Sequence, residues 1–120
     1  MRIKIDTLDK LFSQLVKLLA DGICEYCGKA GRETSHFHSR RKRSVRYDRD
    51  NACFLCFSCH RYLDENPYVH TEFFKKRLGS EKFEQLNIRA ELIIKITQKQ
   101  KNAIKADLKE KIRLLEGAKE

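Results

Sequence analysis

Apolar residues recur at helical spacing near the start of the chain, over residues 7–21. The apolar face of this segment consists of Leu8, Leu11, Phe12, Leu15, Val16, Leu18 and Leu19. Asp6 or Thr7 can cap its first turn, and Gly22 can end it. The pattern predicts an amphipathic helix that packs on the core. Before it, apolar and basic residues alternate, which predicts a short extended arm over residues 1–5.

Two short runs that favour strands flank a polar, basic loop in the middle of the chain. They cover residues 33–37 and 52–55, and a helical pattern begins at Phe57 and continues to about Leu63. Because the two runs border one loop, an antiparallel hairpin is the simplest pairing. The sequence therefore predicts a ββα unit.

The remaining part of the chain, from residue 66 onward, has helical patterns. Asn66 and Pro67 can begin a helix that stops at Gly79, and Ser80 starts another that carries Phe83 and Leu86. Beyond Ile88 the pattern is helical almost to the end, with room for a break in the polar residues 97–101. One apolar stripe would hold Ile93, Ile96, Ile104, Leu108, Ile112 and Leu115. This closing helix could dock on the rest of the chain, pair with a second copy, or cover DNA.

Length sets the number of domains. A chain of 120 residues is close to the commonest size of one domain. We expect a single α+β domain: residues 1–22 supply an arm and a helix, residues 23–64 the cysteine motifs and the ββα unit, and residues 65–120 the C-terminal helices.

Charge indicates the kind of partner. Lys and Arg total 26 against 17 Asp and Glu, which gives a formal charge of +9 and a sequence pI of about 9.5. A polyanion, and DNA in particular, is the natural ligand for such a surface. The sequence has no apolar stretch long enough to cross a bilayer and no signal-peptide pattern, so we expect no membrane association and a cytoplasmic location.

Four of the five cysteines form two C-x-x-C pairs, Cys24 with Cys27 and Cys56 with Cys59. In a reducing compartment such pairs indicate a metal site, and four thiolates are the ligands of a structural zinc. Cys53 and Cys56 also have this spacing. We favour Cys56 with Cys59, because a helical pattern follows that pair, and we expect Cys53 to be a buried strand residue.

Three polar residues around the basic loop can carry chemistry. His36 lies in the first predicted strand, and a neutral imidazole can take a proton from an attacking water. Asn51 opens the second strand, where its amide carbonyl could hold the His36 ring. His60 follows the second cysteine pair and could bind a divalent ion.

The order of these motifs resembles that of the HNH, or ββα-metal, nucleases, and more narrowly that of the phage NinG/Rap recombination proteins. The resemblance covers about residues 24–86: a C-x-x-C pair, His36-Phe37-x-Ser39-Arg40, Arg46-Tyr47-Asp48-x-Asp50-Asn51, and Leu55-Cys56-x-x-Cys59-His60. It implies that His36 is the general base, that Asn51 orients it, and that His60 binds a catalytic Mg or Mn ion. It also implies that the four cysteines hold zinc.

The second ligand of the catalytic ion is the point of departure from the family. Many HNH nucleases have an Asp directly before the general base, where this chain has Ser35. NinG-like sequences have an acidic residue three positions before the histidine, and here that residue is Glu33. In a strand, Glu33 and Ser35 point to the same face, opposite His36. His38 is a further candidate for a metal ligand or phosphate contact, with an exposed loop histidine as the alternative.

The loop between the strands concentrates positive charge. Its basic side chains are Arg40, Arg41, Lys42, Arg43, Arg46 and Arg49. We expect them to contact DNA phosphates, which gives salt-dependent binding without base readout.

Together these features predict a metal-dependent DNA endonuclease that hydrolyses phosphodiester bonds. The resemblance further implies a role in phage or prophage recombination, on branched or structured DNA, in the cytoplasm of the bacterial cell. Two alternatives belong to other classes: a zinc-stapled DNA-binding module that has lost catalysis, with Ser35 as its trace, and a recruiting subunit that acts through its C-terminal helix. A homodimer formed through that helix is a further possibility for assembly.

Overall fold

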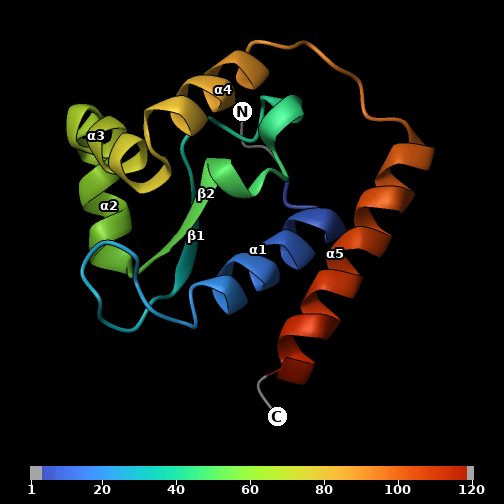
Figure 1. Ribbon diagram of the computed structural model, residues 1–120, viewed down its shortest axis with the longest axis horizontal. Coiled ribbons are helices and arrows are strands. Elements are labelled where there is room, and N and C mark those ends of the chain that lie inside the picture. The colour runs from blue at the N-terminus through green and yellow to red at the C-terminus, as the bar shows by residue number, and fades with distance from the viewer. Residues whose placement is uncertain (1–3, 119–120) are drawn as a thin grey trace.

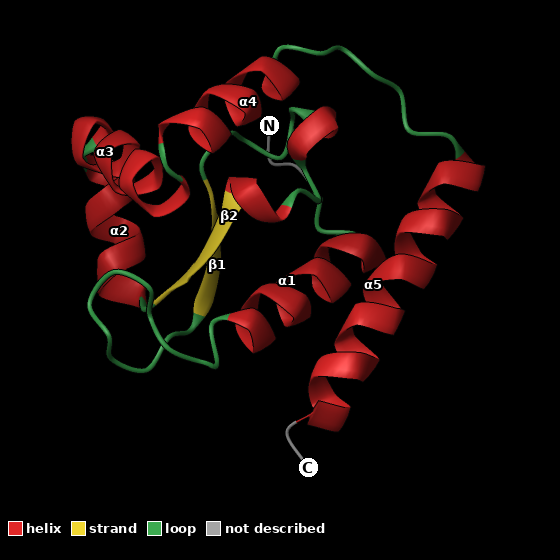
Figure 2. Ribbon diagram, in the orientation of Figure 1, coloured by secondary structure: helices red, strands yellow, loops and turns green. Residues whose placement is uncertain are grey.

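Among the described residues, a short antiparallel hairpin lies at the centre of five α-helices (Figure 1). The structure is a computed structural model that describes residues 4–118, so residues 1–3 of the predicted arm lie outside the described part. The helices and strands are, in chain order, α1 (Thr7–Leu19), β1 (Glu33–His36), η1 (Arg43–Val45), η2 (Arg49–Asn51), β2 (Ala52–Leu55), α2 (Phe57–Glu65), α3 (Pro67–Leu78), α4 (Ser80–Ala90) and α5 (Gln98–Ala118). This mixture of helices around one small sheet confirms the predicted α+β class (Figure 2).

Helix α1 begins with a capping box. The Asp6 carboxylate accepts a hydrogen bond from the Asp9 amide at 2.7 Å, and the Asp9 carboxylate accepts one from the Asp6 amide at 2.9 Å. Two orphan amides of the first turn are thereby satisfied. The helix ends at Leu19, before the predicted end at residue 21, because Asp21 and Gly22 both have positive φ angles and leave the helical conformation.

The hairpin forms in the expected place. Strands β1 and β2 pair antiparallel, with Glu33 opposite Leu55 and His36 opposite Ala52. Asn51 lies in η2, a short 3-10 helix that leads directly into β2. The register leaves the two ends of the polar loop close together, because the loop begins where β1 stops and ends where β2 starts.

Helices α2, α3 and α4 cover one side of the hairpin (Figure 1). Helix α2 starts directly after Cys56, whose thiol accepts a hydrogen bond from the Cys59 amide. Asn66 and Pro67 separate α2 from α3 as predicted, but the Asn66 side chain donates to the Tyr62 carbonyl instead of capping α3. The amide therefore stabilises the end of α2.

The break in the C-terminal helical pattern lies earlier than expected. Helix α4 ends at Ala90, residues 92–97 form neither helix nor strand, and α5 begins at Gln98. The predicted helical stripe is therefore wrong for Ile93 and Ile96. Thr97 explains the position of the break: its hydroxyl accepts from the Gln100 amide at 3.2 Å, and the Gln100 side chain accepts from the Thr97 amide at 2.8 Å. This reciprocal capping starts α5.

Of the three arrangements considered for the closing helix, the structure shows docking on the rest of the chain. Helix α5 lies along α1 (Figure 1), and Leu108 and Ile112 pack in one cluster with Phe12 and Leu15. The remaining members of the predicted stripe, Ile104 and Leu115, cover the edge of this cluster.

A second cluster lies on the opposite face of the hairpin. It joins Cys24, Cys53 and Leu55 to Leu63 of α2 and Phe74 of α3. Alternate residues of β2 thus serve the two clusters, with Ala52 and Phe54 on the α1 side. No helix within residues 4–118 is both long enough and apolar enough to cross a membrane.

A close approach of backbone to ring makes Gly31 a test of this packing. A Cβ at Gly31 would overlap the Phe54 ring and lie 3.1 Å from the Cys24 backbone nitrogen. We expect Gly31→Ala to lower the free energy of unfolding by about 1–3 kcal/mol, because such overpacking forces the ring to move. Chemical denaturation measures the change.

Gly117→Ala is the matched control for this substitution. Gly117 lies in α5, and a methyl group added there would meet no atom of another element within 4 Å. We expect the free energy of unfolding to be unchanged or slightly higher in this variant, because alanine favours helix. Equal stability of the two variants would contradict the tight contact at Phe54.

Candidate metal centres and nuclease site

Four cysteines from two distant segments meet at one end of the hairpin. Cys24 and Cys27 lie in a tight turn in which the Gly28 amide donates to the Cys24 carbonyl at 2.9 Å, with Gly28 at φ +80°. Cys56 and Cys59 lie at the start of α2. Their Sγ atoms all lie within 4.8 Å of one another. The structure thus confirms the predicted cysteine cluster.

The cluster fits a tetrahedral metal ion. Ligands at about 2.3 Å around a tetrahedral zinc lie about 3.8 Å apart. The Sγ atoms of Cys27 and Cys56 are 3.8 Å apart. Four thiolates can therefore hold a structural ion such as zinc without a rearrangement of the backbone.

The pKa values of two of the four thiols also favour a bound cation. Although burial opposes ionisation, hydrogen bonds from the backbone at Cys27, Cys56 and Tyr26 lower the pKa of Cys24 to about 6. Burial and the neighbouring thiols raise the pKa of Cys59 far above its usual value. The Cys24 thiolate forms readily, and its negative charge then opposes ionisation of Cys59. A bound dication would compensate this repulsion between thiolates.

Cys53 does not belong to the cluster. It lies in β2 with no exposed surface, and burial raises the pKa of its thiol to about 12. A thiol in that state behaves as a small apolar side chain. This placement resolves the two possible C-x-x-C registers in favour of Cys56 with Cys59.

His36 and His60 line one cavity of about 290 Å³ between α1, β1 and α2. The other residues of its wall are Ile5, Asp9, Ser13, Thr34 and Arg40. The two histidines come from different elements, because β1 ends at His36 and α2 places His60 four residues after its N-cap at Cys56. The fold therefore brings together two of the three polar residues singled out in the sequence.

His36 is held by a backbone carbonyl. Its Nε2 donates to the carbonyl of Arg46 at 3.2 Å, so the proton of the neutral ring lies on Nε2 and Nδ1 is a free acceptor. The ring also packs on Phe12, with centroids 5.8 Å apart. Burial lowers the pKa of His36 below its usual value, which keeps the ring neutral at physiological pH.

Asn51 contacts the loop and not the His36 ring. Its fully buried amide accepts from the His38 backbone at 2.7 Å and donates to the carbonyls of His38 and Val45. The expected contact from the Asn51 carbonyl to His36 is thus replaced by the Arg46 carbonyl. Asn51 instead holds the loop next to Arg46, through its hydrogen bond to the Val45 carbonyl.

Two carboxylates flank the His60 ring. Glu33 Oε1 lies 3.1 Å from Nδ1, and Asp64 Oδ2 lies 3.5 Å from Nε2. Sequence reasoning proposed Glu33 but missed Asp64. The available signal was spacing: residues four apart on a helix share a face, and Asp64 follows His60 by four.

Glu33 and His60 Nδ1 can supply two ligands of one hard divalent ion, whereas Asp64 lies at the opposite ring nitrogen. Adjacent ligands of an octahedral ion at about 2.1 Å lie about 3.0 Å apart. The 3.1 Å separation between Glu33 and His60 matches that geometry, and carboxylate and imidazole are ligands that Mn and Mg accept. These two residues therefore fit part of the coordination shell of such an ion.

Ser35 and His38 lie apart from this group. Ser35 is 1% exposed and pairs with Cys53 across the hairpin, on the face that is covered by α2 and α3. His38 Nε2 lies 2.8 Å from Asn87 Oδ1 of α4. Of the three residues considered as further ligands of a catalytic ion, only Glu33 contacts His60.

The basic side chains of the loop fall into two groups, those that contact Asp9 and those that are exposed to solvent. Arg46 forms a buried ion pair, with 2.6 Å between its Nη2 and Asp9 Oδ2, and Arg40 lies 3.4 Å from the same carboxylate. Although burial opposes it, the hydrogen bond with Arg46 lowers the pKa of Asp9. Arg46 thus ties the loop to α1 through Asp9. The exposed basic side chains of the loop are Arg41, Lys42, Arg43 and Arg49.

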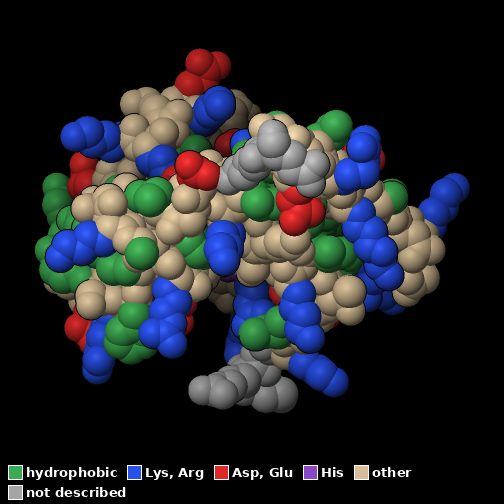
Figure 3. All heavy atoms as spheres, turned by 90° about the horizontal axis from the view of Figure 1, so that it is seen from below, with side chains coloured by type: hydrophobic (Ala, Val, Ile, Leu, Met, Phe, Trp, Pro, Cys, Tyr) green, Lys and Arg blue, Asp and Glu red, His purple; other side chains and the backbone are tan. Residues whose placement is uncertain are grey.

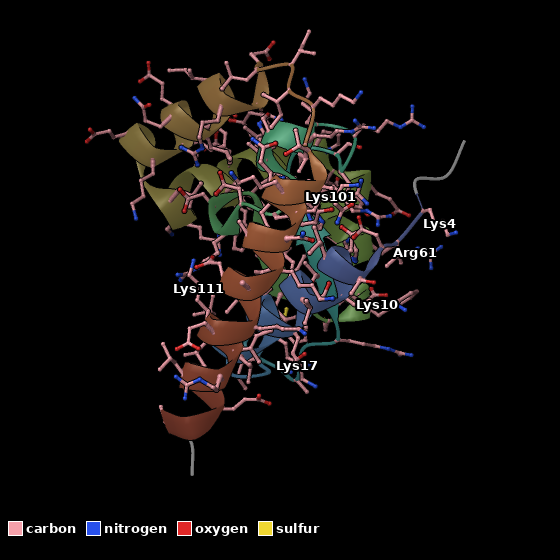
Figure 4. The ribbon with its side chains drawn as sticks, turned by 90° about the vertical axis from the view of Figure 1, so that its right-hand side faces the viewer. Lys4, Lys10, Lys17, Arg61, Lys101 and Lys111 are labelled. Atoms are coloured by element: carbon pink, nitrogen blue, oxygen red, sulfur yellow. The ribbon has the colours of Figure 1, made fainter. Side chains whose placement is uncertain are left out.

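Basic side chains outside the loop lie on the side of α1 that faces the cavity. Ser13 of α1 lines the cavity, and Lys10 and Lys17 lie three and four positions from it, so they share that side of the helix. Figure 4 shows them on one side of the molecule together with Lys4 and Arg61. Lys and Arg also outnumber acidic side chains over the face seen in Figure 3. Sequence analysis missed these residues, because only the fold brings them together.

Residues 24–64 match the family model of the HNH endonuclease. This segment contains both cysteine pairs, the hairpin and α2. No curated protein and no solved structure gives a significant match to the chain. The match supports the HNH superfamily for this segment, in agreement with its ββα fold.

Zinc content tests the ligand assignment. We expect one zinc per chain in the purified protein, and we expect Cys56→Ala to lose at least about tenfold in zinc affinity. The matched control is Cys53→Ala, which removes a thiol three residues away that lies outside the cluster. Metal analysis after dialysis measures both. Loss of zinc in a folded Cys53→Ala protein would contradict the assignment.

Proposed function

We propose that the protein is a metal-dependent DNA endonuclease that hydrolyses phosphodiester bonds. One observation carries the proposal: His36 and His60 open into one cavity inside a ββα segment that matches the HNH endonuclease family. The family match makes nuclease chemistry and a DNA substrate the coarse expectation. The residue roles below are inferred from the geometry.

His36 is the proposed general base. Because Nε2 donates to the Arg46 carbonyl, Nδ1 keeps a lone pair for the proton of an attacking water. The lowered pKa keeps this lone pair available at neutral pH. The Arg46 carbonyl also stabilises the protonated ring after proton transfer, since both ring nitrogens then carry hydrogens.

His60 and Glu33 are the proposed ligands of a catalytic divalent ion, since Glu33 Oε1 lies beside His60 Nδ1. Asp64 lies at the opposite ring nitrogen, where it would orient the ring. When bound, an ion such as Mg or Mn polarises the scissile phosphate and stabilises the leaving oxygen. His60 would hold it at the wall of the cavity that His36 also lines. Glu33 takes the place that Asp occupies in the family pattern, which removes the need for Ser35 as a ligand.

The cysteine cluster has a structural task in this proposal. A closed site of four thiolates leaves no open position for substrate, so zinc there stabilises the fold and takes no part in hydrolysis. The position of His60 depends on it, because His60 directly follows Cys59.

DNA would bind across the cavity through its phosphates. Arg40 lies at the cavity wall, and Lys10 and Lys17 lie along α1. The exposed loop residues 41–43 and Arg49 add further positive charge. Contacts of this kind hold a strand without reading its bases. Arg46 is left out of this set because Asp9 holds its guanidinium.

The resemblance to NinG/Rap proteins refines the proposal. It supports branched or otherwise structured DNA as the substrate and phage or prophage recombination, in the bacterial cytoplasm, as the setting. A homodimer would form through the face of α5 that does not pack on α1.

A zinc-stapled DNA-binding module without catalysis is the second candidate. One observation favours it: the residue before His36 is a buried serine, where many HNH nucleases have a metal-binding Asp. This candidate keeps the basic surface and the cysteine cluster but predicts no strand cleavage.

Cleavage by a His36→Ala variant decides between the two candidates. We expect the zinc-loaded parent to nick labelled linear or branched DNA when Mg or Mn is added, and not when both are omitted. Removal of the base should lower the rate by about 10²–10⁴-fold. His38→Ala is the matched control, because His38 faces Asn87, and it should cleave at a rate near that of the parent. A parent that binds but never nicks DNA would favour the binding module.

The pH dependence of cleavage tests the state of His36. The neutral ring is the active form, so the rate falls as the pH drops through the pKa of His36. Burial lowers that pKa, so we expect the half-maximal rate below pH 6.5, the ordinary value for histidine. Single-turnover rates between pH 5 and 8 would measure the midpoint. A midpoint above 7 would contradict a buried neutral base.

A further inference from the structure

The segment between α4 and α5 exposes three consecutive aliphatic side chains. Leu92 is 57% exposed, Ile93 101% and Ile94 45%. Single exposed aliphatic residues are common on proteins, but three in a row make a contiguous apolar patch that favours a binding partner. Residues 92–97 form no helix or strand that would explain their outward position.

The patch is anchored at both ends. On its N-terminal side, Ala90 is buried, the Ser44 hydroxyl donates to the Arg89 carbonyl at 2.6 Å, and Arg89 forms an ion pair with Asp48. On its C-terminal side, Ile96 lines a groove beside α5. The exposed side chains therefore project from a segment that is tied to the polar loop.

Positive charge surrounds the patch. Leu92, Ile93 and Ile94 line a hollow of about 520 Å³ whose other wall is formed by the basic residues 41–43. Glu91 is the one acidic residue of this lining. Three adjacent cations beside an apolar patch match a ligand that is both anionic and apolar, as DNA is where its bases are accessible.

A second copy of the chain fits this surface poorly. Each chain carries a formal charge of +9, and a copy seated here would bring its own cations against residues 41–43. DNA is favoured by continuity as well. Arg40 lines the cavity of His36 and His60, and the next residue, Arg41, lines the hollow, so the two sites adjoin along the chain.

We infer that Leu92 and Ile93 form an apolar wedge that enters a base step of DNA held by the basic residues 41–43. The wedge rests on the DNA binding in the proposed function but not on cleavage. Partial insertion of aliphatic side chains unstacks a base step and bends the duplex. The energy for this comes from burial of side chains that are otherwise exposed to water.

Fluorescence of 2-aminopurine measures the wedge directly, because this base brightens when it is unstacked. The zinc-loaded full-length protein is titrated into a linear duplex in which 2-aminopurine replaces adenine, with Mg and Mn omitted so that the strands stay intact. We expect the fluorescence to rise on binding by the parent. Ile93→Ser should abolish the rise and weaken binding about tenfold.

Leu114→Ser is the matched control, since Leu114 has the same 57% exposure as Leu92 but lies near the other end of α5. It should brighten and bind the duplex as the parent does. The wedge is overturned if Ile93→Ser brightens the duplex like the parent, or if the parent binds without brightening or does not bind at all. A parent that brightens the duplex but never cleaves DNA with Mg or Mn would refute the nuclease and leave the wedge intact.

Discussion

The meeting of Cys24 and Cys27 with Cys56 and Cys59 is the constraint on which the rest of the central unit depends. The first pair lies in a turn that is itself bound to β2, since Phe54 donates to the Glu25 carboxylate at 2.6 Å and the Glu25 amide donates to the Phe54 carbonyl. The second pair begins α2. A metal ion there would fix the angle at which α2 leaves the hairpin, and with it the position of His60. A chain of this size has a modest core, so such a staple contributes a large share of its stability.

A second constraint is the ion pair of Asp9 with Arg46. Asp9 has two tasks, because it completes the capping box of α1 and receives the Arg46 guanidinium. The ion pair ties α1 to the polar loop at the residue whose carbonyl accepts from His36. One carboxylate thereby connects the start of a helix to the orientation of the proposed base. Because Asp9 binds the Arg46 guanidinium, Arg46 is not available to bind phosphate. A basic residue in the loop is therefore not always part of a phosphate-binding surface.

Local patterns sufficed to predict the strands, α1 and the cysteine cluster, because periodicity, caps and C-x-x-C spacing act over a few residues. They failed where distant residues decide. The contact of the Arg46 carbonyl with His36 spans ten residues, and the basic side chains of α1 join the cavity only through the fold. Two misses had local signals: Asp64 lies one helical turn after His60, and Thr97 with Gln100 marks a helix start. The apolar stripe that continued through Ile93 concealed that start.

The two candidate metal positions differ in chemistry although adjacent residues of α2 contribute to them. Cys59 belongs to a set of four sulfur ligands, whereas His60 is flanked by the oxygens of Glu33 and Asp64. Thiolates favour zinc, and carboxylates favour Mg or Mn, so the donor atoms themselves sort the ions. Successive residues in the first turns of a helix point about 100° apart, which directs the two side chains to different sides of α2. One helix can therefore hold a structural ion on one side and, in the proposed function, a catalytic ion on the other. The adjacent residues Cys59 and His60 supply one ligand to each.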